Sequence, residues 1–116
     1  MEENDLRKRL FNFSVNIILA IRKLPNSSEY KVITYQLIKS ATSSAANYEE
    51  AQAAVSRNDF SNKVGISLKE MRESNYWIRV INAISDKSSE WVDLERESDE
   101  LMKILGSIYT KTSKSR

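Results

Sequence analysis

The sequence predicts an all-α fold, an antiparallel up-down-up-down bundle of four helices. Only two Gly and one Pro occur in 116 residues, too few for the many turns of an all-β fold. Apolar residues recur in alternating steps of three and four, the period of one helix face. Short polar segments divide this pattern into four stretches, so residues 1–116 are expected to form one bundle domain.

The first helix is predicted over about residues 5–24. Asp5 suits an N-cap, and Pro25 ends the helix because proline disfavours helical geometry in the residue before it. Three further apolar residues widen its stripe and offer a second contact surface: Phe11, Ile18 and Ile21. The expected core stripe is Leu6, Leu10, Phe13, Ile17, Ala20 and Leu24.

The second helix is predicted over about residues 27–55. Asn26 as N-cap, with Glu29 three residues later, resembles a capping box. The core stripe of this helix begins with Tyr30, Ile33 and Leu37 and then becomes polar at the same spacing. A polar stripe where apolar side chains belong is the feature that most needs an explanation.

The third helix is predicted over about residues 57–85, with Ser56 as N-cap and Asp59 near the positive helix end. Gly65 inside this helix should cost about 1 kcal/mol relative to Ala, which indicates close packing there. The core stripe is expected to be Phe60, Val64, Ser67, Met71, Ser74, Ile78 and Ile81, flanked by Ile66, Trp77, Val80 and Ile84.

The fourth helix is predicted over about residues 89–109 and is followed by a flexible basic tail, residues 110–116. Its expected core stripe is Trp91, Leu94, Ser98, Leu101, Leu105 and Ile108.

The polar stripe on the second helix, with the residues expected opposite it on the third, is called the polar seam. It comprises Ser40, Ser43, Ser44, Asn47, Glu50, Glu70 and Glu73, with Ser67 and Ser74 as further partners. The favoured interpretation is a hydrogen-bond network that fixes helix register; the alternative is a ligand or metal pocket. Under the first interpretation, Asn47 should be largely buried with a partner on a neighbouring helix.

Four carboxylates, of Glu49, Glu50, Glu70 and Glu73, suggest a metal-binding bundle. Di-iron bundles need Glu-x-x-His motifs, and the chain has no His, so that site is excluded in its usual form. An all-oxygen Mg²⁺ or Ca²⁺ site is the open alternative to simple ion pairs. Since Cys, nucleophile–base pairs and Gly-rich phosphate loops are also missing, the sequence predicts neither an enzyme nor a cofactor or small-molecule substrate.

Charge is distributed unevenly along the chain. Residues 86–100 contain seven acidic and two basic side chains and therefore carry −5, so the remainder of this +2 chain carries +7. The candidate nucleic-acid contacts are the clustered basic residues Arg7, Lys8, Arg9, Arg22, Lys23, Lys31 and Lys39. An ordinary solvated surface is the alternative. A further alternative is self-association, in which the acidic fourth helix meets the basic first helix or the tail of a second copy.

Nothing in the sequence predicts a membrane protein. The longest apolar run, residues 17–21, is too short to span a bilayer, and the N-terminus is acidic, unlike a signal peptide. A cytoplasmic location is therefore expected.

Two motifs resemble a known family. The first comprises residues 35–43, 46–47 and 50–51, and the second comprises Ser56 and residues 59–60, 66–70, 72–73 and 76–79. Helix 1 adds Phe13, Val15 and residues 24–25. The family comprises four-helix bundle proteins related to those encoded by intervening sequences of bacterial large-subunit ribosomal RNA genes. This chain departs from its pattern at Ser44, Ala45 and Tyr48, which alters packing without threatening the fold.

The resemblance implies a ring-like homopentamer. Distant relatives include the accessory protein of diversity-generating retroelements, a basic pentamer that binds nucleic acid and a reverse transcriptase. We therefore expect a non-enzymatic homo-oligomeric scaffold or interaction protein, with RNA or DNA binding as the alternative.

Overall fold

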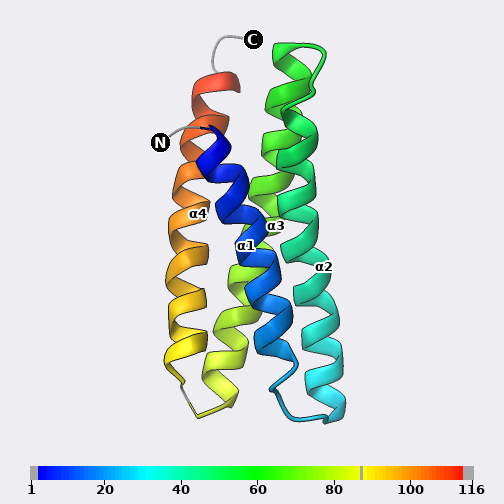
Figure 1. The fold of residues 1–116 in the computed structure, drawn as a ribbon, viewed down its shortest axis with the longest axis vertical. Helices are drawn as coiled ribbons and strands as arrows, with labels where there is room; N and C mark the ends of the chain where they lie inside the picture. The colour runs from blue at the N-terminus through cyan, green and yellow to red at the C-terminus, as the bar shows by residue number, and fades with distance from the viewer. Residues whose placement is uncertain (1–2, 87, 114–116) are drawn as a thin grey trace.

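Four antiparallel helices in cyclic order form the molecule, which measures 45 × 23 × 21 Å (Figure 1). The computed structural model describes residues 3–86 and 88–113. Its helices are α1 (Glu3–Ile21), α2 (Ser28–Ala51), α3 (Arg57–Ile84) and α4 (Ser89–Ser113). The predicted all-α antiparallel bundle is confirmed. None of the helices in the described ranges is both long and apolar enough to cross a membrane.

The core follows the predicted stripes. Five of the six stripe residues of α1 are buried, and Leu24 packs against the core from the turn after the helix. Phe13, Leu37, Met71 and Leu101, one from each helix, are at most 1% exposed. Each buried side chain of this size stabilises the fold by roughly 1.5–3 kcal/mol relative to an exposed one. The apolar residues predicted beside the core stripes differ in burial. Trp77 and Val80 pack against the core, whereas Phe11 and Ile66 are exposed.

Helix contacts are unequal around the bundle. The α2–α3 and α3–α4 pairs pack along most of their length, whereas α1, the shortest helix, touches α4 least. α1 is therefore the helix least secured by core packing, and its polar contacts gain importance.

The N-cap of α2 and the last residues of α1 and α2 differ from the predicted positions. The N-cap of α2 is Ser27, not Asn26, because the Ser27 hydroxyl accepts a hydrogen bond from the Tyr30 amide. α1 ends at Ile21 rather than residue 24, because residues ahead of Pro25 form a tighter turn. α2 ends at Ala51 rather than residue 55, since the chain must turn before Ser56, which caps α3 as predicted.

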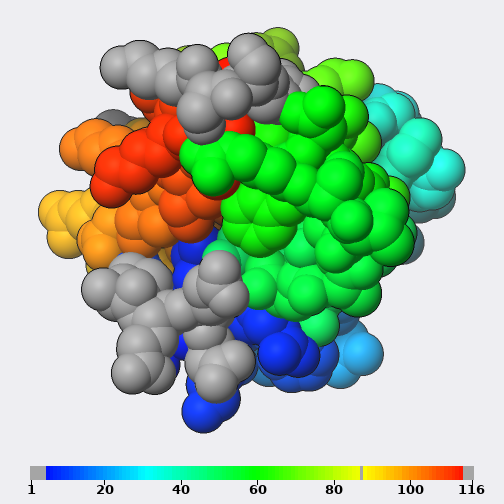
Figure 2. Space-filling view, turned by 90° about the horizontal axis from the view of Figure 1, so that it is seen from above, coloured from blue at the N-terminus to red at the C-terminus, as the bar shows by residue number. Residues whose placement is uncertain are grey.

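α4 runs to Ser113, so the prediction of a flexible tail from residue 110 is wrong for residues 110–113. Residues 114–116 lie outside the described part of the chain. Arg57, at the start of α3, donates to the carbonyl oxygens of Lys111 and Thr112. These bonds satisfy acceptors that a helix end leaves open. In the view from above, the α2–α3 turn lies beside the last turn of α4 (Figure 2).

The two glycines, Gly65 and Gly106, offer a test of the α3–α4 packing. A Cβ on Gly65 would lie 2.9 Å from Cε1 of Tyr109, whereas one on Gly106 would meet no atom within 4 Å. Gly106→Ala should therefore raise the free energy of unfolding by about 0.5–1 kcal/mol through helix propensity. Gly65→Ala should gain at least about 1 kcal/mol less, because the tyrosine ring must move. Urea unfolding measures both, and equal gains would contradict the contact.

Candidate functional site

The centre of the polar seam is a reciprocal serine contact between α2 and α3. The Ser44 hydroxyl donates to the Ser67 carbonyl at 2.8 Å, and the Ser67 hydroxyl donates to the Ser44 carbonyl, also at 2.8 Å. The hydroxyls of Ser40, about one turn from Ser44 on α2, and of Ser74, about two turns from Ser67 on α3, lie 2.8 Å apart. All four residues are at most 1% exposed.

Each of these four buried hydroxyls has an acceptor for its proton within the α2–α3 pair, so none has a free donor for a ligand. Each reaches the backbone or hydroxyl of the facing helix, which is possible only because serine is small enough to let the backbones approach. A shift of one residue along either helix would break both reciprocal bonds. The geometry therefore supports the register interpretation over a ligand pocket.

The remaining seam residues do not face α3 in this way. The Asn47 amide donates to the carbonyl and hydroxyl of Ser43, one turn back on α2, and its side chain is only half-buried. The expectation that Asn47 is largely buried with a partner on a neighbouring helix is wrong. A side-chain amide reaches the carbonyl four residues back, so a local partner was available.

The seam carboxylates diverge instead of gathering. Glu50 is exposed and pairs with Lys63 at 3.4 Å, and Glu73 accepts a hydrogen bond from the Trp77 indole. Glu49 pairs with Arg7 on α1 at 3.0 Å, whereas Glu70 contributes its backbone carbonyl, which accepts a hydrogen bond from the Ser74 hydroxyl. Within residues 3–86 and 88–113, no group of three or more His, Cys, Asp or Glu could hold a metal ion. The alternative of an all-oxygen metal site thus has no support.

A second polar network, which the sequence interpretation missed, joins α3 to α4. The Asn75 amide donates to the Ser98 hydroxyl and to Oδ1 of Asp99, both at 2.9 Å, while Arg79 donates to Oδ1 of Asn75. Two turns on, Asn82 repeats the pattern and donates to the Trp91 carbonyl and to Glu95. The seven-residue spacing of the two asparagines beside the core stripe was the available signal.

Basic residues predicted as nucleic-acid contacts on α1 are largely engaged within the chain. Arg9 makes two hydrogen bonds to Glu97, at 2.6 and 3.1 Å, and a third to Glu100. The hydrogen-bonded Glu97 carboxylate raises the pKa of the Arg9 guanidinium, against the lowering effect of burial, and Glu100 adds to the increase. Lys23 pairs with Glu90 at 3.2 Å.

The other predicted contacts, Lys8, Arg22, Lys31 and Lys39, are exposed and dispersed over α1, the turn after it and α2. Acidic α4 thus meets basic α1 within one chain, where the sequence interpretation placed this contact between two copies. The positive charges of Arg7, Arg9 and Lys23 are therefore offset by glutamates of the same chain.

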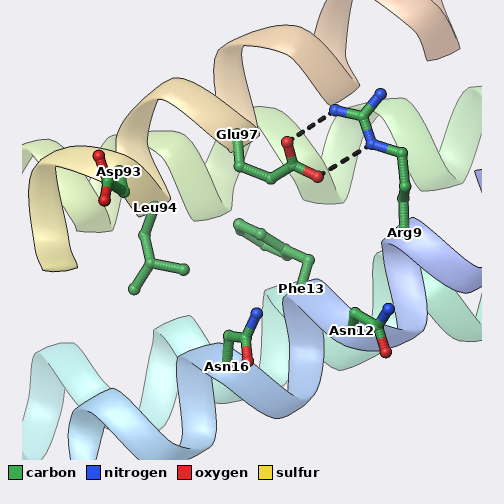
Figure 3. A pocket seen from close by; sticks show the side chains of 7 residues that line it. All are labelled: Arg9, Asn12, Phe13, Asn16, Asp93, Leu94 and Glu97. Carbon is green, nitrogen blue, oxygen red and sulfur yellow. Dashed lines mark hydrogen bonds and ion pairs between the residues drawn. The ribbon is translucent and has the colours of Figure 1, made fainter.

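A shallow pocket of about 300 Å³ lies between α1 and α4 (Figure 3). Phe13 points into it from α1, the Arg9–Glu97 pair closes one end, and Asn12 and Asn16 line its α1 side. Asp93 and Leu94 line the α4 side. The lining contains amides, carboxylates and a guanidinium already bound to a carboxylate, and no nucleophile paired with a base.

Comparison with known proteins supplies the wider context. The model of the 23S rRNA-intervening sequence protein family matches residues 2–107. A crystal structure of a protein of unknown function from the S23 ribosomal protein family of Bacteroides thetaiotaomicron is similar, with 33% sequence identity and a TM-score of 0.84. That similarity covers 95% of this chain and 99% of the other. Among curated proteins, none matches.

The reciprocal serines can be tested by a double-mutant cycle. Ser44→Ala and Ser67→Ala should each lower the free energy of unfolding by about 1 kcal/mol. The double variant should lose less than the sum of both, because the two hydroxyl oxygens also lie 3.1 Å apart and each single substitution already removes that shared contact. Ser43→Ala, outside the α2–α3 contact, should cost less than about 0.5 kcal/mol. Strict additivity in denaturant unfolding would show that the two serines are not coupled.

The α1–α4 ion pairs can be tested by removing one cation. Arg9→Gln should lower the free energy of unfolding by about 1 kcal/mol at low salt, and high salt should reduce the loss. Lys8→Gln removes an adjacent, exposed charge that forms no ion pair with the described residues, and should change stability by less than about 0.5 kcal/mol. Equal effects of the two substitutions in thermal unfolding would contradict a specific Arg9 contact.

Proposed function

Because the chain belongs to the 23S rRNA-intervening sequence protein family, we propose that it is a non-enzymatic, self-associating interaction protein of the cytoplasm. No cofactor or small-molecule substrate is part of this function. The observation that carries the proposal is an exposed apolar surface that one copy of the chain leaves uncovered.

This surface, the α1–α2 apolar stripe, comprises Phe11, Val15 and Leu19 on α1 with Val32 and Tyr35 on α2. The three α1 residues follow one another at intervals of four and so share one helix face. Phe11 is 61% exposed and Tyr35 is 64% exposed. Large apolar side chains gathered in this way mark interaction surfaces.

Two contacts show that both helices contribute to one side of the bundle. The Ser14 hydroxyl donates to the Ala41 carbonyl at 3.1 Å, and Arg7 pairs with Glu49. These antiparallel pairings put Leu19 at about the level of Tyr35. The stripe therefore draws its residues from two adjacent helices.

A second copy is the occupant that the family resemblance supports, in the form of a closed ring of five. A ring requires a heterologous contact, in which the stripe meets a different face of the next copy. Because Arg9 and Lys23 are paired within the chain, apolar burial is the main driving force for such a contact, rather than attraction between α1 and α4 of neighbouring copies.

Nucleic-acid binding is the second candidate function, and one observation favours it. Several cations on α3 and α4 form no ion pair among the described residues, in contrast to Arg7 and Arg9 on α1. This function does not require self-association and can be tested separately.

Self-association is tested by measuring mass in solution. Light scattering or native mass spectrometry should find a multiple of 13.4 kDa, with five copies expected. Val15→Asn with Leu19→Asn should weaken assembly at least tenfold, because polar groups would be buried in the contact. Val55→Ser is the matched control, since Val55 is 91% exposed but isolated in a loop. A monomer at high concentration would overturn the proposal.

A further inference from the structure

The outer side of the α3–α4 pair contains two adjoining hollows that share Arg72. The first, of about 300 Å³, lies beside Gly65, Lys69 and Tyr109. The second, of about 350 Å³, is lined by Arg72, Asp99, Met102 and Lys103. The two hollows, which meet at Arg72, are here together called the basic groove.

The cations of the basic groove are free to bind a partner. Lys69, Arg72 and Lys103 are exposed, and none of them forms an ion pair with the described residues. Asp99 is the carboxylate in the lining, and it already accepts a hydrogen bond from Asn75. Three positive charges therefore face one negative charge, whereas on α1 the arginines are held by glutamates.

Arg79 extends the positive surface by two further turns of α3. Its Nε donates to the neutral Oδ1 of Asn75, so its charge is not offset by that contact. Lys69, Arg72 and Arg79 are separated by three and seven residues and follow one side of the helix. Phosphates spaced along a strand suit such a row of charges.

Aromatic rings accompany the cations. Tyr76 is 49% exposed and packs edge-to-face against Trp77, with ring centroids 4.9 Å apart. The Arg79 guanidinium lies 5.8 Å from the centroid of the Tyr76 ring. Tyr109 lines the groove at its other end, beside Gly65. Rings placed among cations can stack with unpaired bases while the cations hold the phosphates.

We propose that the basic groove binds single-stranded nucleic acid, with Lys69, Arg72 and Lys103 on phosphates and Tyr76 on a base. From Gly65 to Arg79 the helix rises about 20 Å, which matches about six nucleotides at the ~3.4 Å spacing of stacked bases. A duplex hides the faces of its bases and would leave the tyrosines unused. This inference rests on the nucleic-acid function proposed above and not on self-association.

The test is fluorescence anisotropy with a labelled 12-nucleotide oligouridine at low salt, using the full chain. The variant K69Q/R72Q/K103Q should weaken binding at least tenfold and reduce the salt dependence by about two in the log–log slope. The matched control K8Q/R22Q/K39Q removes the same number of exposed charges, which likewise form no ion pair within the described part of the chain, and should weaken binding less than threefold. Tyr76→Leu should weaken binding about fivefold or more without changing the salt slope.

Three results would overturn the proposal: no binding by the unmodified chain, equal losses in the two triple variants, or polyglutamate or duplex RNA competing as well as the oligouridine. Circular dichroism should show unchanged folding of both triple variants, whose substituted residues are exposed. The mass of each variant is measured in parallel. Oligouridine binding by a monomer would support the groove while contradicting self-association, so the two proposals fail separately.

Discussion

The close approach of α2 and α3 through Ser44 and Ser67 is the constraint on which the bundle depends. Each hydroxyl donates a hydrogen bond to the backbone of the facing helix. These bonds fix the position of α2 relative to α3 along the bundle axis. Apolar side chains alone would tolerate sliding, because dispersion and burial are non-directional. Once this register is set, the core side chains of α2 and α3 form the surface on which α1 and α4 pack.

The other interfaces use different polar devices. Asn75 and Asn82 join α3 to α4 through buried side-chain amides, whereas α1 is attached by Ser14 on one side and by Arg9 on the other. Ion pairs at a partly exposed edge contribute less than buried hydrogen bonds with unique geometry. α1 is thus the helix whose attachment depends most on solution conditions, and it also carries much of the exposed apolar stripe.

The cyclic order of the helices separates the two proposed surfaces. In the cyclic order of the helices (Figure 1), the α1–α2 pair, whose residues form the apolar stripe, is opposite the α3–α4 pair, whose residues line the basic groove. An assembly built on the first pair can leave the second pair accessible. Repetition around a closed ring would multiply modest phosphate contacts, because neighbouring grooves act on one strand at a raised effective concentration.

The four helices, most of the core and the stripe of Ser40 and Ser44 can be predicted from the amino-acid sequence, because a 3.6-residue period and a few capping residues are local properties. Which basic side chains form ion pairs depends on the tertiary structure and could not be predicted from the sequence. Arg7, Arg9 and Lys23 resemble a binding cluster in one dimension, yet folding brings Glu49, Glu97 and Glu90 to them from other helices. Lys69 and Arg72 are on α3, whereas Lys103 is on α4, more than 30 residues later in the sequence. Only the packing of α3 against α4 brings the three side chains together. Asn47 is a single-residue example of this limit of prediction from sequence. Its spacing along α2 is that of a core position, but its side-chain amide donates to Ser43 on the same helix.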